Sequence, residues 1–347
     1  MRRVFLVLFL VFAAGCASKS ELSSLFPAEV WLAARPLPVA PDDLQEPLAM
    51  LCTGGLLVTT NFRTPHLLRI YDLGDGRFRD LIPRGRGAAE LLTATSMWAS
   101  EDSLRVYDID SRRVWSAPLA RLFDDDPHAA AAPAPVRCHR MTSCGTRTGR
   151  RLVLAASEEE TDGDLLRLLD GSGCETARFG AFGLRGRAVA PCELPFVFQG
   201  EALADGFGRR IVYASSFGCL FRFYATEDFA QVRLLRAYDF GEPLCSPASD
   251  PQSGIFSVRW HDDCPSGTLA LTGDENRCYA LCEEGKRLAD EEWRAATVCE
   301  FDWEGNPCRL LRLDRPVQTI ACDREGRRLV ALALRGDGGY ELLAYPL

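Results

Sequence analysis

The chain lacks the short motifs that define several large enzyme classes. It contains no Gly-x-Ser-x-Gly elbow, no His-Glu-x-x-His, no P-loop and no complete Gly-x-Gly-x-x-Gly, and only four of its 347 residues are histidine. The nucleophile, zinc-protease, nucleotide and dinucleotide sites that these motifs build are therefore not indicated.

Lysine is almost missing as well. Lys19 and Lys286 are the only two, and the formal net charge is −8. If residues 1–15 are removed as a leader, two arginines leave with them, so 38 basic residues face 48 acidic ones and the charge becomes −10. Such an acidic chain argues against nucleic acid or an anionic membrane surface as a partner.

Long apolar runs are confined to the amino terminus. Arg2 and Arg3 precede an apolar stretch over residues 4–14, which suits a signal peptide and is too short to span a bilayer. The stretch ends in Ala-Ala-Gly before Cys16, an arrangement that resembles the bacterial lipobox, in which the cysteine is acylated. We expect a signal peptide over 1–15, lipidation at Cys16 and a tether over 16–30. The alternative is an ordinary cleaved signal followed by a chance cysteine.

The residue after that cysteine bears on location. Ala17 stands where an aspartate would indicate inner-membrane retention, so the resemblance implies an outer-membrane lipoprotein, with its periplasmic or surface orientation left open.

Cysteine is abundant, with 14 residues, yet no Cys-x-x-Cys pair occurs. Without Cys16 the number is odd, so at least one thiol is free or pairs with another chain. Cys278 and Cys282 would lie about 13 Å apart on one face of a strand, beyond disulfide reach. Cys138 and Cys144 could close a loop. We expect mostly small buried hydrophobes, with one or two disulfides left open and no metal assigned.

Short strands separated by turns repeat along the whole chain. The Leu-Arg-Ile-Tyr-Asp and Leu-Arg-Val-Tyr-Asp segments ending at Asp72 and Asp108 are 36 residues apart, and Asp75-Gly76 is typical of a tight hairpin. This pattern predicts an all-β fold, a six-bladed β-propeller of mostly four-stranded antiparallel blades over residues 31–347. A two-domain sandwich is the alternative, and residues 288–296 are the best short helical candidate.

Two segments resemble a known family. The stretch over 67–73 followed by Arg-Gly-Arg-Gly-Ala-Ala-Glu-Leu at 84–91, and Phe-Asp-Trp-Glu-Gly-Asn-Pro at 301–307, resemble the TolB-like six-bladed propeller lipoproteins of Bacteroides-type bacteria. The family has Pro and Phe where this chain has Ala88 and Leu91. The resemblance implies an envelope lipoprotein; its motifs specify turns, and Asp302 is expected to bond local backbone amides.

Three clusters could carry chemistry. His261, Asp262 and Asp263 could bind a divalent ion or move a proton, although a polar loop is the simpler interpretation. Cys138-His139 could be a nucleophile pair, and the acidic run 124–126 could bind calcium, but it lacks the ligand spacing of a calcium loop. Asp72, Asp108 and Asp323 are expected to tie down hairpins at strand ends.

The functional hypothesis is a non-catalytic binding or scaffold module for an envelope protein or glycan, with no cofactor. The alternative is a propeller hydrolase or lyase acting on a carbohydrate or lactone at the channel mouth. Convergence of His261, an aspartate pair and an arginine at one end of the channel would favour the enzyme.

Overall fold

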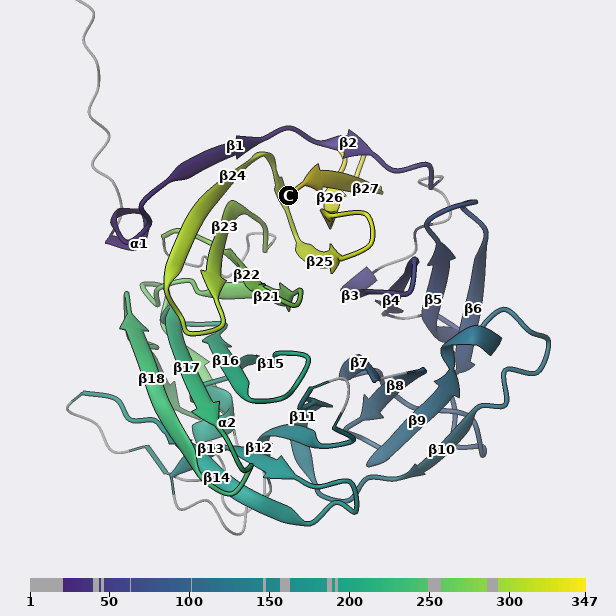
Figure 1. Cartoon of the computed structure of the whole chain (residues 1–347), viewed down its shortest axis with the longest axis horizontal. Helices are drawn as coiled ribbons and strands as arrows, with labels where there is room; N and C mark the ends of the chain where they lie inside the picture. Colours follow the sequence, from purple (N-terminus) through teal and green to yellow (C-terminus); the bar gives the residue numbers. More distant parts are fainter. Residues whose placement is uncertain are drawn as a thin grey trace, which may run out of the picture.

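The computed structural model describes residues 21–39, 44, 47–62, 64–100, 102–145, 148–156, 163–185, 189–190, 193–248, 257–285 and 293–347. Six antiparallel sheets stand around a common axis as the blades of a closed ring (Figure 1). The six-bladed propeller expected from the sequence is confirmed. Among the described residues, no helix has the length and apolar character needed to cross a bilayer.

The blades follow one another along the chain, each starting with its innermost strand. Blade 1 holds β3 (Pro47–Thr53), β4 (Leu56–Asn61), β5 (His66–Asp72) and β6 (Phe78–Pro83). Blade 2 holds β7 (Ser96–Ser100), β8 (Ser103–Asp108), β9 (Arg113–Pro118) and β10 (Ala130–Pro133). Blade 3 holds β11 (Cys138–Ser143), β12 (Arg151–Ala156), β13 (Asp164–Leu169) and β14 (Glu175–Ala181).

The second half of the ring is built in the same way. Blade 4 holds β15 (Gly200–Ala204), β16 (Arg210–Ser215), β17 (Leu220–Thr226) and β18 (Val232–Asp239), and blade 5 holds β21 (Thr268–Gly273), β22 (Arg277–Cys282), β23 (Ala295–Asp302) and β24 (Pro307–Val317). Blade 6 holds β25 (Thr319–Asp323), β26 (Arg328–Leu334) and β27 (Tyr340–Pro346). A small hairpin, β19 (Cys245–Pro247) and β20 (Val258–Trp260), lies between blades 4 and 5. In the part of the chain that the structure describes, the α-helices α1 (Glu21–Ser24) and α2 (Leu194–Val197) are single turns, and Leu119–Arg121 forms a short 3-10 helix.

Each blade buries both of its faces, and strand periodicity explains how. Neighbouring side chains on a strand point to opposite faces. In β4, Leu57 packs with Val330 of blade 6, whereas the next residue, Val58, packs with Val106 of blade 2. An isolated blade would expose both apolar surfaces to water, so closure of the ring supplies the burial that stabilises every blade.

The ring is closed by strands from both ends of the chain. β2 (Arg35–Pro36) pairs with β27 and supplies the fourth strand of blade 6. Just before it, β1 (Glu29–Leu32) pairs in parallel with β24 as a fifth strand on blade 5. Residues 21–30, expected to be part of a tether, therefore pack along the outside of the propeller in the described structure.

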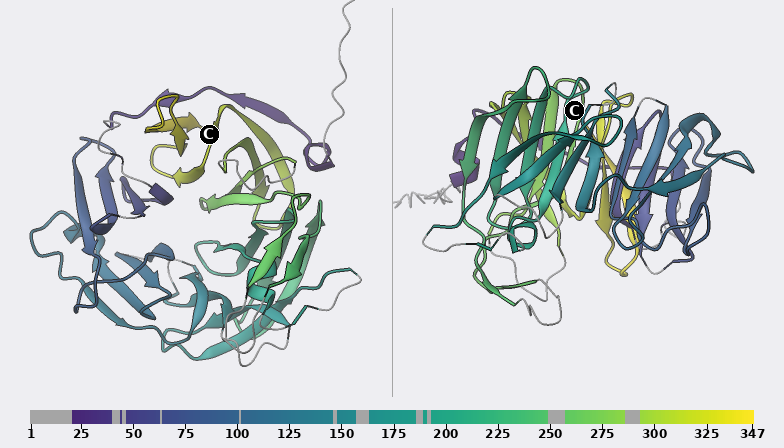
Figure 2. Two further views of the ribbon diagram at one scale, coloured as in Figure 1. Left: turned by 180° about the vertical axis from the view of Figure 1, so that it is seen from behind. Right: turned by 90° about the horizontal axis from the view of Figure 1, so that it is seen from below.

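The two faces of the ring differ in their connections. The turns between the first and second strands of all blades lie on one face, called here the turn face, because every blade enters the centre in the same direction. Links from one blade to the next lie on the opposite, connection face. Figure 2 shows the blades from the side.

Two expectations about local structure were wrong. The 36-residue interval between Asp72 and Asp108 does not separate equivalent strands, since β5 is the third strand of blade 1 and β8 is the second strand of blade 2. Residues 288–296 are not a helix where they are described: Ala295 and Ala296 begin β23. Residues 288–292 lie outside the described part.

Aspartates at strand ends do tie down turns, as expected. Asp72 accepts hydrogen bonds from the backbone N–H of Gly74 at 2.9 Å, and Asp323 accepts one from that of Gly326 at 3.0 Å. Asp302 accepts from the N–H of Asn306 at 2.7 Å. Within the same turn, Gly305 has φ 82°, and a Cβ there would lie 2.6 Å from the Phe223 ring, so this position requires glycine.

Candidate functional site: the channel and its mouth on the turn face

The six inner strands surround a central channel. β3, β7, β11, β15, β21 and β25 lie nearest the axis (Figure 1), and a cavity of about 480 Å³ lies between them. Hydroxyls and charged groups line it beside apolar side chains. The polar lining residues are Thr53, Thr60, Thr95, Ser96, Arg140, Thr142, Ser143, Glu201, Thr272, Glu275, Asp323, Arg324 and Glu325.

Side chains from adjacent blades satisfy the exposed edges of these inner strands. The carboxylate of Glu201 accepts a hydrogen bond from the N–H of Leu271 at 2.8 Å and pairs with Arg140 at 3.4 Å, which joins blades 3, 4 and 5. The Thr272 hydroxyl accepts one from the N–H of Cys322 at 2.9 Å, which joins blades 5 and 6. Since an unpaired strand edge invites pairing with another chain, these bonds keep the channel wall closed and its shape defined.

The channel opens on the turn face beside the turn between β21 and β22. Glu275, in this turn, borders the channel and also two surface hollows that flank it. One hollow, of about 780 Å³, extends toward blade 6, and the other, of about 950 Å³, extends toward blade 4. Together the three spaces, which all border Glu275, are called here the mouth recess.

Both ends of the mouth recess carry charged groups of both signs, and the end toward blade 4 adds aromatic side chains. Toward blade 4, Phe207, Phe229 and Trp303 lie among charged residues, and Phe207 is 60% exposed. The charged residues there are Asp205, Arg209, Arg210, Glu227, Glu275, Arg277, Asp302 and Glu304. Toward blade 6 both signs of charge alternate around Tyr279 and Cys308. The charged residues there are Asp274, Glu275, Arg277, Glu300, Arg309, Asp323, Arg324, Glu325 and Arg327.

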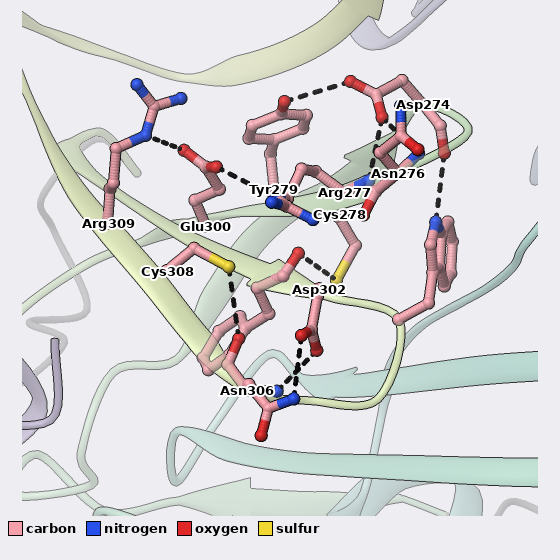
Figure 3. A network of polar contacts seen from close by, with 12 residues as sticks. Asp274, Asn276, Arg277, Cys278, Tyr279, Glu300, Asp302, Asn306, Cys308 and Arg309 are labelled. Atoms are coloured by element: carbon pink, nitrogen blue, oxygen red, sulfur yellow. Dashed lines mark hydrogen bonds and ion pairs between the residues drawn. The ribbon is translucent and has the colours of Figure 1, made fainter. Parts of the chain in front are cut away.

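A network of polar contacts holds the central turn rigid (Figure 3). The carboxylate of Asp274 accepts from the N–H of Asn276 at 2.7 Å and of Arg277 at 2.8 Å, and also from the Tyr279 hydroxyl at 3.1 Å. The backbone carbonyl of Asp274 accepts from the indole N–H of Trp303 at 3.2 Å. Because Asp274 accepts these four hydrogen bonds, the position of its neighbour Glu275 is fixed.

The same network holds a buried carboxylate between two guanidinium groups. The Glu300 side chain is 4% exposed and lies 2.7 Å from Arg309 and 3.3 Å from Arg277 (Figure 3). Glu300 thus has two cationic partners, in a hollow whose lining carries five acidic and four basic residues. Both arginines reach the surface of the recess, being 38% and 40% exposed, so they can contact a ligand without losing Glu300.

The Glu300–Arg309 pair reverses a charge pattern found in three other blades, and this pattern was not predicted from the sequence. There a basic residue of the third strand pairs with an acidic residue of the fourth, whereas blade 5 carries the acid on the third strand. The pairs are Arg69–Asp80, Arg167–Glu175 and Arg222–Asp239, against Glu300–Arg309. The recurring Leu-Leu-Arg of residues 67–69 and 165–167 was the available signal for the first two.

Comparisons with known proteins identify the fold and nothing finer. No family model matches the chain, and no curated protein matches it in sequence. The chain is similar to a solved structure from Bacteroides fragilis assigned as an exported protein, with TM-score 0.55, 9% identity, and 90% of this chain and 94% of the other covered. A member of the DUF4221 family from Bacteroides vulgatus matches with TM-score 0.52 and 12% identity over 90% and 95% of the two chains.

The histidine cluster proposed from the sequence lies elsewhere. His261, Asp262 and Asp263 are exposed on the link from blade 4 to blade 5, on the connection face, and none of them lines the channel or the mouth recess. A nitrogen of the His261 ring lies 2.7 Å from the Ser246 hydroxyl. Among the described residues no group of three potential metal ligands converges.

The possible nucleophile pair is not assembled for catalysis. Cys138 is 2% exposed, and burial raises the pKa of its thiol to about 12. The ring of its neighbour His139 packs edge-on against Phe196 at 4.9 Å. A protonated, buried thiol is a poor nucleophile. The acidic run 124–126 is exposed, and Asp124 pairs with Arg121 at 2.9 Å.

No disulfide joins the cysteines in the described part of the chain, and most of these cysteines are buried. Cys278 and Cys282 share one face of β22 in the core between blades 4 and 5, as expected. Cys322 borders the channel, and burial, with a contribution from the charge of Asp274, raises the pKa of its thiol to about 12. Cys16 and the leader lie outside the described residues.

Proposed function

We propose that this chain is a TolB-like lipoprotein of the outer membrane, acylated at Cys16, whose propeller is a non-catalytic module that binds a protein partner at the mouth recess. The single observation that carries the binding site is the meeting of the channel and two hollows at Glu275, on a turn held by Asp274 and Trp303. Binding sites are concave, largely pre-formed and furnished with a few fixed polar groups.

The lining favours a protein over a glycan. Guanidinium and carboxylate groups line both ends of the recess, and the end toward blade 4 also offers aromatic side chains such as Phe207 and Trp303. A protein segment offers apolar side chains and both signs of charge, so it can match both ends at once. A neutral glycan would leave Arg324 and Glu325 without charged partners.

The lipid anchor is supported by the sequence around Cys16. A positive start, an apolar core over 4–14 and small residues before the cysteine are the features that an acylated leader needs. The two similar Bacteroides structures support the propeller fold of the TolB-like assignment.

Site-specific photo-crosslinking tests the binding site in the intact envelope. A photoreactive amino acid at Glu275 is expected to give a discrete protein adduct, and the same residue at Asp262, on the connection face, is expected to give none. Phe207→Asp should abolish the adduct by replacing the exposed aromatic ring of the recess with a carboxylate. Leu234→Asp is the matched control, since Leu234 is 53% exposed on β18 of the same blade.

Three results would overturn the proposal. Position 275 could give no adduct, or the two positions could give the same adducts. Alternatively, the adduct from position 275 could resist protease and yield to glycosidase, which would make the partner a glycan.

A further inference from the structure

The amino-terminal segment joins the propeller much earlier than residue 31. Leu22 and Phe26 are 5% and 7% exposed, in the core between blades 4 and 5, and the Phe26 ring meets Phe301 edge-on at 5.2 Å. A guanidinium N–H of Arg312 donates to the Ser23 hydroxyl at 2.9 Å. The chain is therefore held against blade 5 from α1 onward.

Because α1 is docked, only a short segment of chain connects the propeller to the proposed anchor. Cys16 and Glu21 are five residues apart in the sequence. Even a fully extended chain spans at most about 18 Å over that distance. A propeller acylated at Cys16 must therefore keep the surface around α1 within that distance of the lipid headgroups.

The outer surface beside α1 carries the most exposed large apolar side chain that the structure describes. Trp31, in β1, is 74% exposed, while Val30 and Leu32 on either side turn inward against the core of blades 5 and 6. The acidic neighbour Glu29 is paired at 2.6 Å with Arg312, whose guanidinium group also pairs with Glu284. Tryptophan is enriched where proteins meet the lipid headgroups, because its ring is amphipathic.

We propose that the rim formed by residues 21–32, the anchor rim, rests on the bilayer with the Trp31 indole among the headgroups. The inference rests on the lipid anchor of the proposed function. The anchor rim lies on the outer circumference of the ring (Figure 1), so the propeller would stand edge-on to the membrane and leave its turn face open to a partner. Addition of a second copy along β1 is disfavoured because this edge strand has only four residues and Pro27 lies just before it.

Fluorescence quenching by lipid tests this contact. The full-length acylated protein is placed in vesicles of phosphatidylethanolamine and phosphatidylglycerol, with or without brominated acyl chains. The wild type is expected to lose part of its tryptophan emission to the bromine, and Trp31→Phe is expected to abolish that loss. Trp293→Phe is the matched control: Trp293 is 51% exposed but lies on the connection between β22 and β23, and its removal should leave the quenching in place.

Two measurements distinguish the rim contact from the lipid anchor. They are co-sedimentation of the protein with vesicles and the mass of the first residue of the mature protein, which shows whether it is acylated. If the protein carries no acyl group and does not sediment with vesicles, the anchor fails and the rim contact fails with it. If it is acylated and sediments but quenching is equal in wild type and Trp31→Phe, only the rim contact is refuted. A vesicle-free dimer that dissociates on Trp31→Phe would instead assign the surface to a second copy.

Discussion

Asp108 offers a quantitative test of how this propeller holds its blade connections. The side chain is fully buried at the end of β8. One carboxylate oxygen accepts from the N–H of Leu92 at 2.7 Å, and the other accepts from the Thr93 hydroxyl at 2.7 Å and the N–H of Asp110 at 2.9 Å. Ser111 donates further bonds from its N–H and hydroxyl. The carboxylate thus ties the link from blade 1 to the turn after β8.

Asp108→Asn replaces one accepting oxygen by an N–H₂ group that must face donors. A hydrogen bond to a charged group contributes about 1.5–3 kcal/mol, and a buried donor left without a partner costs about 1–3 kcal/mol. The side-chain oxygen that remains still accepts hydrogen bonds, and this offsets part of the loss in unfolding free energy. We expect the variant to lose about 3 kcal/mol of unfolding free energy at neutral pH.

The pH dependence gives the sharper check. Burial raises the pKa of Asp108, but hydrogen bonds from Ser111, Leu92 and Thr93 outweigh it, and the net pKa lies below the ordinary value. A lowered carboxyl pKa stabilises the fold above the unfolded pKa of about 3.9, and this contribution is lost as pH falls through the folded value. The gap between wild type and Asp108→Asn should therefore be constant from neutral pH to about 5 and shrink below about 4.

Urea unfolding at several pH values measures this gap through the midpoint, with the slope unchanged. Asp125→Asn is the control, because Asp125 is exposed, and it should change stability by less than about 0.5 kcal/mol. The reasoning is refuted if the Asp108 variant costs no more than the control, or if its cost persists unchanged in acid.

Two other predictions address the amino-terminal segment and the thiols. Phe26→Ala removes a buried ring from the contact with Phe301 and should lower the free energy of unfolding by about 3 kcal/mol. The expected signs are a lower urea midpoint and faster proteolysis near α1, and an unchanged midpoint would contradict the docking. Iodoacetamide at neutral pH should alkylate the exposed Cys174 in the folded protein and should react with Cys138 only after unfolding, since burial raises the pKa of the Cys138 thiol. Mass mapping of the labelled cysteines, with Cys174→Ser as control, checks this. Rapid labelling of Cys138 in the native protein would support a nucleophilic role for it.

Features set by neighbouring residues were predictable from the sequence. The turn aspartates Asp72, Asp302 and Asp323 bond groups within a few residues, so composition and spacing are enough to find them. The strands were predictable because alternation and turn residues are local as well. The 36-residue interval misled because similar strand sequences serve as the third strand in one blade and the second in the next.

The candidate site was not predictable in the same way. Glu300 is charged yet buried, and only its position opposite Arg309 and beside Arg277 explains how it is tolerated. His261 looked suggestive because it adjoins two aspartates in sequence, but the structure places it on the connection face, away from the mouth recess.

By itself, the sequence determined the class of fold, because short alternating strands with local turns cannot bury their apolar faces except against one another. The tertiary structure alone decided what meets at the mouth recess and on the anchor rim. Glu29 and Arg312, 283 residues apart in sequence, are brought into contact by β1 packing on blade 5. Phe207, Glu275 and Arg324 border one recess because the closing ring sets their three blades side by side, and no local pattern encodes such neighbours.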